Sequence, residues 1–165
     1  MAWLHLFVGR MMTNDEPIDG AASVLARLER AANAHDVNAL VACFAPDYRN
    51  DTPVHPERSF TGREQVRRNW EQIFAAIPDL TAKVLSSAVN DDEVWSEWEH
   101  RGTRPDGSAH VMRGVVIFGT GQGVVTSARF YLEPVQEGGG NVDAAVRRQV
   151  GAPGRPSPAS STERP

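Results

Sequence analysis

The stretch NAHDVNALVACFAPDYRNDTPVHPERSFTGREQVRRNW, residues 33–70, holds the signals that decide the fold. Asp36 predicts a helix start, because an aspartate side chain can accept a hydrogen bond from a backbone N–H of the first turn. The residues after it place one apolar face on this helix: Val37, Leu40, Val41 and Phe44. Pro46 predicts the end of the helix, since proline has no N–H for the helical ladder. Pro53 and Pro56 then mark a loop, and Gly62 precedes the next helix.

Two further helices are predicted, one before this stretch and one that begins after its loop. Before it, apolar residues recur at helical spacing: Ile18, Ala21, Ala22, Leu25, Leu28 and Ala32. After Gly62 a second set recurs in the same way: Val66, Trp70, Ile73, Phe74 and Ile77. Pro78 closes this third helix. The first half of the chain is therefore predicted to be helical.

The second half of the chain has the pattern of β-strands. We expect strands at about residues 80–89, 93–103, 109–119 and 123–135. They are separated by turn-forming residues at 90–92, 105–107 and 119–123. Helices followed by a meander predict an α+β fold, in which three N-terminal helices pack on a strongly curved antiparallel sheet. Strands of this length should curl around a helix into a cone that encloses a cavity.

Composition limits the function classes. The chain has 165 residues, a net charge of −4 and a hydrophobic fraction of 41%, which suits one globular domain. A net negative charge argues against nucleic acid as a partner. No apolar run approaches the length of a membrane span, so we expect no membrane partner. The single cysteine, Cys43, fits a reducing compartment and predicts a cytoplasmic location.

Both ends of the chain differ in composition from the middle. Residues 1–17 are expected to form an extension outside the fold, with Met11 or Met12 as the natural start. Residues 150–165 are rich in proline and serine and are expected to be a disordered tail. The folded domain is predicted to be 18–149.

The order of elements resembles the nuclear transport factor 2-like superfamily, in its SnoaL-like, polyketide cyclase-like branch. The resemblance is carried by residues 33–70, with Phe44, Pro46-Asp47 and Gly62-Arg63-Glu64, and by a closing strand at 127–131. It covers about residues 18–135. It implies a cone-shaped sheet on three helices, a pocket inside the cone and a homodimer. It also implies acid–base chemistry of an isomerase, cyclase or hydrolase kind on a hydrophobic carbonyl or polyketide-like substrate.

Strand alternation divides the side chains of the sheet into two faces. The mainly apolar set is assigned to the inner, concave face: Val94, Ser96, Trp98, His100, His110, Met112, Gly114, Val116, Phe118, Ala128, Phe130 and Leu132. The loop and the third helix should add Tyr48, Thr52 and Trp70 to the cavity. The predicted ligand-binding residues are therefore Tyr48, Thr52, Trp70, Trp98, Met112 and Phe130. An apolar cavity with a few polar groups is typical of a small-molecule site.

The candidate catalytic residues are Asp51, His100 and His110. The resemblance does not supply a complete site. The ketosteroid isomerases place a catalytic aspartate directly before the loop proline. Thr52 occupies that position here, and Asp51 lies one residue earlier. The carboxylate that the family carries on the third strand falls at Gly114. Steroid isomerase activity is therefore not expected. Two interpretations of the histidines are left open: catalysis and a structural role.

The opposite face of the sheet carries apolar groups between charges. Its residues are Trp95, Glu97, Glu99, Arg113, Val115, Ile117, Arg129, Tyr131 and Glu133. We expect a homodimer through this convex face, because exposed aromatic groups would form an unusual patch on a monomer. No metal and no cofactor are expected, and the predicted partner is a hydrophobic small molecule. The alternative to an enzyme is a non-catalytic ligand-binding or dimerisation module of the same fold.

Overall fold

The computed structural model describes residues 20–136, 138 and 140–151 of the chain. The chain divides into two units, Met1–Pro134 and Val135–Pro165. The expected extension at 1–17 and residues 152–165 of the expected tail lie outside the described residues. The domain limits of 18–149 stay a prediction.

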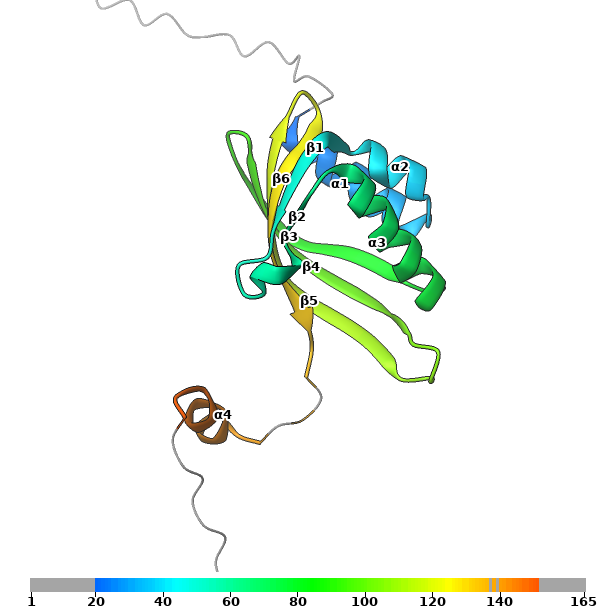
Figure 1. Ribbon diagram of the computed structural model, residues 1–165. Coiled ribbons are helices and arrows are strands. Elements are labelled where there is room, and N and C mark those ends of the chain that lie inside the picture. The colour runs from blue at the N-terminus through cyan, green and yellow to red at the C-terminus, as the bar shows by residue number, and fades with distance from the viewer. Residues whose placement is uncertain (1–19, 137, 139, 152–165) are drawn as a thin grey trace, which may run out of the picture. The chain divides into compact units, whose positions relative to one another are not determined.

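Three helices form one layer of the first unit (Figure 1). They are α1 (Ala21–Asn33), α2 (Val37–Ala42) and α3 (Arg63–Ala76). Asp36 caps α2 as expected, since its Oδ1 accepts a hydrogen bond from Ala39 N at 2.9 Å. Gly62 precedes α3 with φ of +92°, a conformation that favours glycine. The predicted first and third helices are thus confirmed in the described residues.

Six strands form the other layer, and the sheet is strongly curved (Figure 1). The strands are β1 (Phe44–Asp51), β2 (Phe60–Thr61), β3 (Thr81–Asn90), β4 (Glu93–Thr103), β5 (Ala109–Gly121) and β6 (Val124–Pro134). Their order in the sheet is β2-β1-β6-β5-β4-β3, so β2 and β3 are the edges and the sheet is not closed. A short helical turn, η1 (Pro56–Arg58), lies between β1 and β2. The four predicted strands correspond to β3–β6.

The segment after α2 is a strand, which corrects the prediction of a helix reaching Pro46. The helix ends at Ala42, and Phe44 begins β1 instead of lying on a helical face. The backbone of Cys43 is drawn toward the sheet, because Val125 N donates to Cys43 O at 2.8 Å. Proline also fits this segment, since the register of β1 against β6 shifts between Phe44 and Arg49.

The sheet is mixed, which corrects the prediction of a purely antiparallel sheet. β1 pairs with β6 in parallel, whereas β2–β1 and the β3–β6 meander pair antiparallel. A parallel pair needs a long crossover connection, and here α3 and four strands, β2 to β5, provide it. The sequence indicated only the hairpin turns, which dictate antiparallel neighbours, and it contained no local signal for the β1–β6 pairing.

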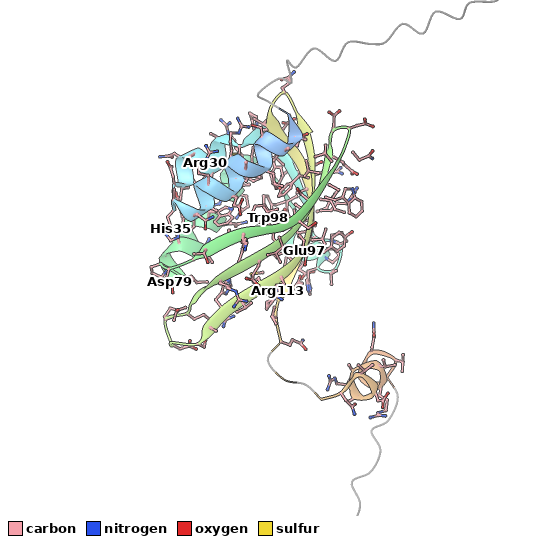
Figure 2. The ribbon with its side chains drawn as sticks, turned by 180° about the vertical axis from the view of Figure 1, so that it is seen from behind. Arg30, His35, Asp79, Glu97, Trp98 and Arg113 are labelled. Atoms are coloured by element: carbon pink, nitrogen blue, oxygen red, sulfur yellow. The ribbon has the colours of Figure 1, made fainter. Side chains whose placement is uncertain are left out.

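The predicted inner face packs against the helices and forms the core. Val94, Trp98, Val116, Phe118 and Ala128 are all buried there, and Figure 2 places Trp98 on this side of the sheet. At Gly114, with φ of +155°, an added Cβ would clash with the carbonyl oxygen of Tyr131. The close approach of β5 and β6 at this point therefore requires glycine.

The opposite face carries the expected cross-strand ion pairs. Glu99 pairs with Arg101 and with Arg113, which lies directly across on β5. Hydrogen bonds from these two guanidinium groups lower the pKa of Glu99 to about 2. Arg129 on β6 pairs with Glu93 at 2.8 Å.

The second unit contains one described helix, α4 (Val142–Gln149). Asn141 caps it, since its Oδ1 accepts a hydrogen bond from Ala144 N at 3.0 Å. This helix was not predicted from the sequence, and none of its eight residues is buried. Within the described residues, no helix is long and apolar enough to cross a membrane.

A candidate ligand-binding cavity

A cavity of about 260 Å³ lies between α3 and the inner face of the sheet. Its wall is mainly apolar and aromatic, with a small number of polar groups. The residues that line it are Phe44, Tyr48, Asn50, Thr52, Arg58, Phe60, Val66, Asn69, Trp70, Ile73, His100, Met112, Phe130, Leu132 and Glu133. Six of these residues are candidates predicted from the sequence: Tyr48, Thr52, Trp70, His100, Met112 and Phe130. This composition is that of a small-molecule site.

Trp98 lines a second, smaller cavity of about 50 Å³ deeper in the core. Both cavities are bounded by the same residues on one side: Phe44, Trp70, His100, Phe130 and Leu132. Trp98 is held in place by a hydrogen bond from its Nε1 to Ser96 Oγ at 2.9 Å. The tryptophan therefore forms the inner end of the apolar space and does not line the larger cavity.

A buried chain of hydrogen bonds runs along β1 and just past its end. Tyr48 Oη donates to Asn50 Oδ1 at 3.0 Å, and Asn50 Nδ2 donates to Thr52 Oγ1 at 3.1 Å. Burial raises the pKa of Tyr48, and the charge of Asp51 adds to this effect. The phenol is therefore a neutral hydrogen-bonding group at physiological pH.

His100 lines the cavity with a half-buried imidazole. Burial lowers the pKa of His100 to about 4, with a smaller contribution from His110. The imidazole lies against two tryptophans, at centroid distances of 6.0 Å to Trp70 and 5.9 Å to Trp98. Among the described residues, no protein group is hydrogen-bonded to it. A neutral imidazole offers one donor and one acceptor, so His100 can serve a bound molecule in either way.

Charged residues gather at one side of the cavity. Glu133 Oε1 lies 3.3 Å from His55 Nε2 and 3.7 Å from Arg58 Nη1. Arg58 and Glu133 also line the cavity. Glu133 lies opposite Arg113 in the sheet, as its assignment to the outer face requires, and it also borders the cavity beside the loop that holds His55 and Arg58. No local pattern in the sequence indicates that His55 and Glu133 meet.

The structure does not bring Asp51 and His110 into the cavity wall. The Asp51 carboxylate pairs with Arg49 at 3.3 Å, and its side chain is 42% exposed. Tyr48, Asn50 and Thr52 point inward, so an intervening residue such as Asp51 points away. His110 lies opposite Gly102, two residues along from the His100–Met112 pair. Its pKa is lowered by partial burial and by the charge of Arg104.

No group of three potential metal-ligating side chains is close enough to hold a metal ion within the part of the chain that the structure describes. The ionisable groups in contact with the cavity are instead separated. His100 lies on the apolar wall, whereas Arg58 and Glu133 pair with each other. This arrangement can hold an apolar molecule and satisfy one of its polar atoms.

The curved sheet on three helices, with a cavity between them, defines the cone fold of the nuclear transport factor 2-like proteins. The SnoaL-like domain family matches residues 25–128, and the chain belongs to this family. A comparison with curated proteins finds no match.

Solved structures share this fold at low sequence identity. A protein of ketosteroid isomerase-like fold from Catenulispora acidiphila, in complex with trimethylamine, is 22% identical with a TM-score of 0.55, covering 66% of this chain and 84% of its own. A Mycobacterium tuberculosis protein in complex with estradiol-17β-hemisuccinate is 21% identical with a TM-score of 0.58, covering 75% and 95%. A candidate polyketide cyclase from Sinorhizobium meliloti is 21% identical with a TM-score of 0.53, covering 67% and 93%.

Proposed function

We propose that this SnoaL-like protein binds an apolar small molecule that carries one hydrogen-bonding group, such as a carbonyl oxygen. The observation that carries the proposal is the half-buried His100, kept neutral by its lowered pKa, among the aromatic and aliphatic residues of the cavity wall. A neutral imidazole can donate one hydrogen bond to a carbonyl oxygen, and the surrounding aromatic rings exclude water from that bond. The apolar body of the ligand would lie against Trp70, Met112 and Phe130.

The bound molecules of two structural neighbours support this class of function. The Catenulispora acidiphila protein holds trimethylamine, and the Mycobacterium tuberculosis protein holds a steroid ester. Both ligands have apolar portions. The same fold therefore accommodates small molecules of very different size, and the size of this ligand is set by the 260 Å³ cavity of this chain.

Acid–base catalysis is the second candidate function, and the open imidazole of His100 favours it. Among the described residues no group is hydrogen-bonded to this imidazole, so a ring nitrogen can approach a proton on the carbon next to a ligand carbonyl. Two observations favour binding over this reaction. A pKa of about 4 makes His100 a weak base, and the described cavity wall offers it no free carboxylate, since Glu133 is paired with Arg58 and His55.

Calorimetric titration with acetylnaphthalene, an apolar ketone, tests the proposed binding. We expect saturable binding by the wild type. Leu132→Trp should abolish it, because Leu132 borders both cavities and an indole would fill the space. Leu85→Trp is the matched control, since Leu85 is 40% exposed on β3. Equal binding by both variants, or none by the wild type, would contradict a ligand site in this cavity.

Deuterium exchange separates binding from catalysis. The methyl protons of acetylnaphthalene lie next to its carbonyl and exchange with D₂O when a base removes them. The binding function predicts that the protein leaves the solvent exchange rate unchanged in nuclear magnetic resonance spectra. Accelerated exchange that disappears in His100→Phe would instead establish the catalytic alternative.

We propose in addition that the protein forms a homodimer through the outer face of the sheet. Trp95 and Tyr131 are 47% and 38% exposed on this face. On β5 between them, Val115 lies opposite Tyr131 and Ile117 lies opposite Trp95. Glu99 already pairs with Arg101 and Arg113 of its own chain, so the aromatic groups and not new ion pairs would provide the association energy.

A further inference from the structure

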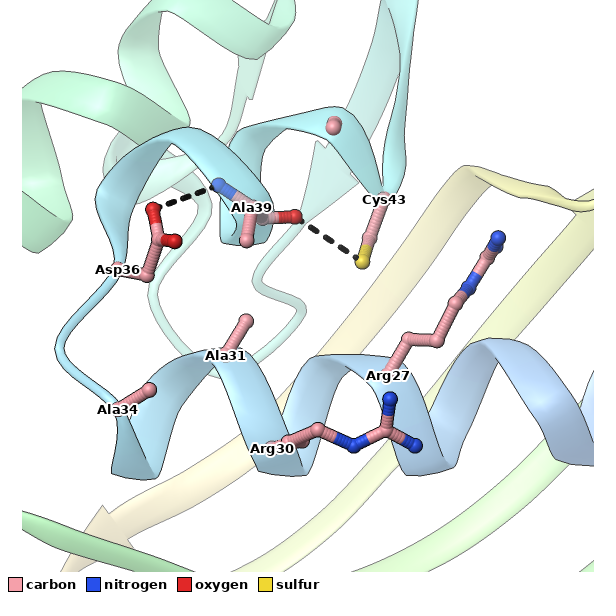
Figure 3. A pocket seen from close by; sticks show the side chains of 8 residues that line it. Arg27, Arg30, Ala31, Ala34, Asp36, Ala39 and Cys43 are labelled. Carbon is pink, nitrogen blue, oxygen red and sulfur yellow. Dashed lines mark hydrogen bonds between the residues drawn. The ribbon is translucent and has the colours of Figure 1, made fainter.

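A second concave site lies on the outer side of the helical layer, between α1 and α2 (Figure 3). This groove has a volume of about 310 Å³ and shares none of its lining residues with either central cavity. Its floor is made of alanines from both helices: Ala31, Ala34, Ala39 and Ala42. Small side chains at these positions leave room for a ligand with an apolar body.

Two arginines of α1 line the same groove. Arg27 donates from one Nη to Gly123 O, whereas its Nε is buried without a hydrogen-bond partner. A buried N–H of a charged group without an acceptor is costly, and an oxyanion in the groove would offset the positive charge of this guanidinium. Arg30 is exposed, and among the described residues nothing forms a hydrogen bond or an ion pair with its side chain.

The opposite end of the groove carries a negative charge. Figure 3 shows Asp36 at this end and the two arginine side chains toward the other. One oxygen of Asp36 accepts the capping hydrogen bond from Ala39 N, so the carboxylate is held in place. Cys43 adds no further charge, because burial raises the pKa of its thiol. The groove is therefore positive at one end only.

We infer that this groove binds a small molecule with one oxyanion, a carboxylate or a phosphate, and a short apolar body. The oxyanion contacts the guanidinium groups of Arg27 and Arg30, which are suited to planar or tetrahedral oxyanions. The apolar body lies on the alanine floor. Asp36 repels a second anionic group at the far end, so a monoanion is preferred over a dianion with charges at both ends.

Calorimetric titration with butanoate, butyl phosphate and succinate tests this inference. The wild type should bind butanoate or butyl phosphate, and the stronger of the two identifies the oxyanion. Arg30→Gln should weaken that binding about tenfold, because one charge-assisted hydrogen bond is lost. Arg68→Gln, an exposed arginine of α3 outside the groove, should leave it unchanged. Succinate should bind more weakly than butanoate. Both have four carbons, but succinate adds a second carboxylate, which Asp36 repels.

A spectroscopic signal locates the bound ion. The side-chain N–H resonances of Arg27 should move on addition of the ligand, because this arginine lines the groove. The inference is wrong if neither butanoate nor butyl phosphate binds, if Arg30→Gln binds as tightly as the wild type, or if the Arg27 resonance does not move. Loss of binding in His100→Phe would also contradict it, since that result would place the anion in the central cavity.

Discussion

Tyr48 Oη donates a hydrogen bond to Asn50 Oδ1 over 3.0 Å, and both side chains are buried in the wall of the central cavity. Tyr48 is only 1% exposed, so no solvent replaces this bond when it is lost. The pair belongs to one face of β1, and Thr52 extends it to the loop. The polar side of the cavity is thus a buried network whose members depend on each other.

Removing the hydroxyl of this network should destabilise the protein. In Tyr48→Phe the aromatic ring remains, but Asn50 Oδ1 loses its donor, so we expect the free energy of unfolding to fall by about 1–3 kcal/mol. Urea denaturation measures this change. Tyr131→Phe is the control, because Tyr131 is 38% exposed and water can solvate its hydroxyl. Equal losses in both variants would show that the hydroxyl of Tyr48 has no special role.

Ser96 should be more sensitive than its size indicates. Its Oγ donates to Val116 O at 2.8 Å and accepts from Trp98 Nε1 at 2.9 Å, and the residue is 1% exposed. Ser96→Ala leaves both partners buried without a bond and should cost about 2 kcal/mol or more. Ser87→Ala on exposed β3 should cost far less. A thermal denaturation series that shows no difference between these two alanine variants would contradict the structure.

The stability of the protein should fall in mild acid because of His100. Its pKa is lowered to about 4 in the folded protein, so the unfolded chain binds a proton at higher pH than the folded chain does. The contribution of the neutral imidazole to the free energy of unfolding is complete above the pKa of His100 in the unfolded chain, near 6.5. It is lost as the pH falls toward the pKa of His100 in the folded protein. Full loss corresponds to about 3 kcal/mol, taking roughly 1.4 kcal/mol for each pKa unit.

His100→Asn isolates this pH effect. Unfolding free energies of the wild type and the variant, measured from pH 7 to pH 4.5, should converge as the pH falls. His110→Asn should retain most of the wild-type pH dependence, because burial of His110 is only partial. Parallel curves for the wild type and His100→Asn would show that His100 titrates normally.

The proposed dimer makes a direct prediction for sedimentation. The wild type should sediment as a dimer at micromolar concentration, and Trp95→Lys should sediment as a monomer, because a charge would replace the largest exposed group of that face. Val54→Lys is the control, since Val54 is 58% exposed in the loop after β1. A monomeric wild type would overturn the dimer without affecting the cavity.

Most of the sheet could be predicted from the sequence because its signals are local. β4 (Glu93–Thr103) has the predicted limits, since turn-forming residues stand at both of its ends. β1 was missed because Phe44 continues the helical spacing of the residues before it, and its pairing partner β6 lies about 80 residues away in the chain. Long-range pairing of this kind leaves no local pattern.

The candidate site was predictable to the extent that side chains alternate between the two faces of a strand. Alternation placed Tyr48 and Thr52 correctly on one face, and it left open whether Asp51 points into the cavity or away from it. The contacts of Glu133 with His55 and Arg58 were not predicted, because these two residues lie in a loop distant in sequence. A lowered pKa for His100 also had no sequence signal, since it depends on how completely the cone encloses the ring.

The most direct test of the proposed function compares two ligands that differ in one group. Acetylnaphthalene and ethylnaphthalene have the same ring system, and only the first has a carbonyl oxygen for His100. Calorimetry should show that His100→Phe lowers the affinity for acetylnaphthalene about tenfold and leaves that for ethylnaphthalene nearly unchanged, whereas His110→Phe changes neither. Equal effects of His100→Phe on both ligands, or none on either, would contradict the claim that His100 recognises the polar group of a molecule bound in this cavity.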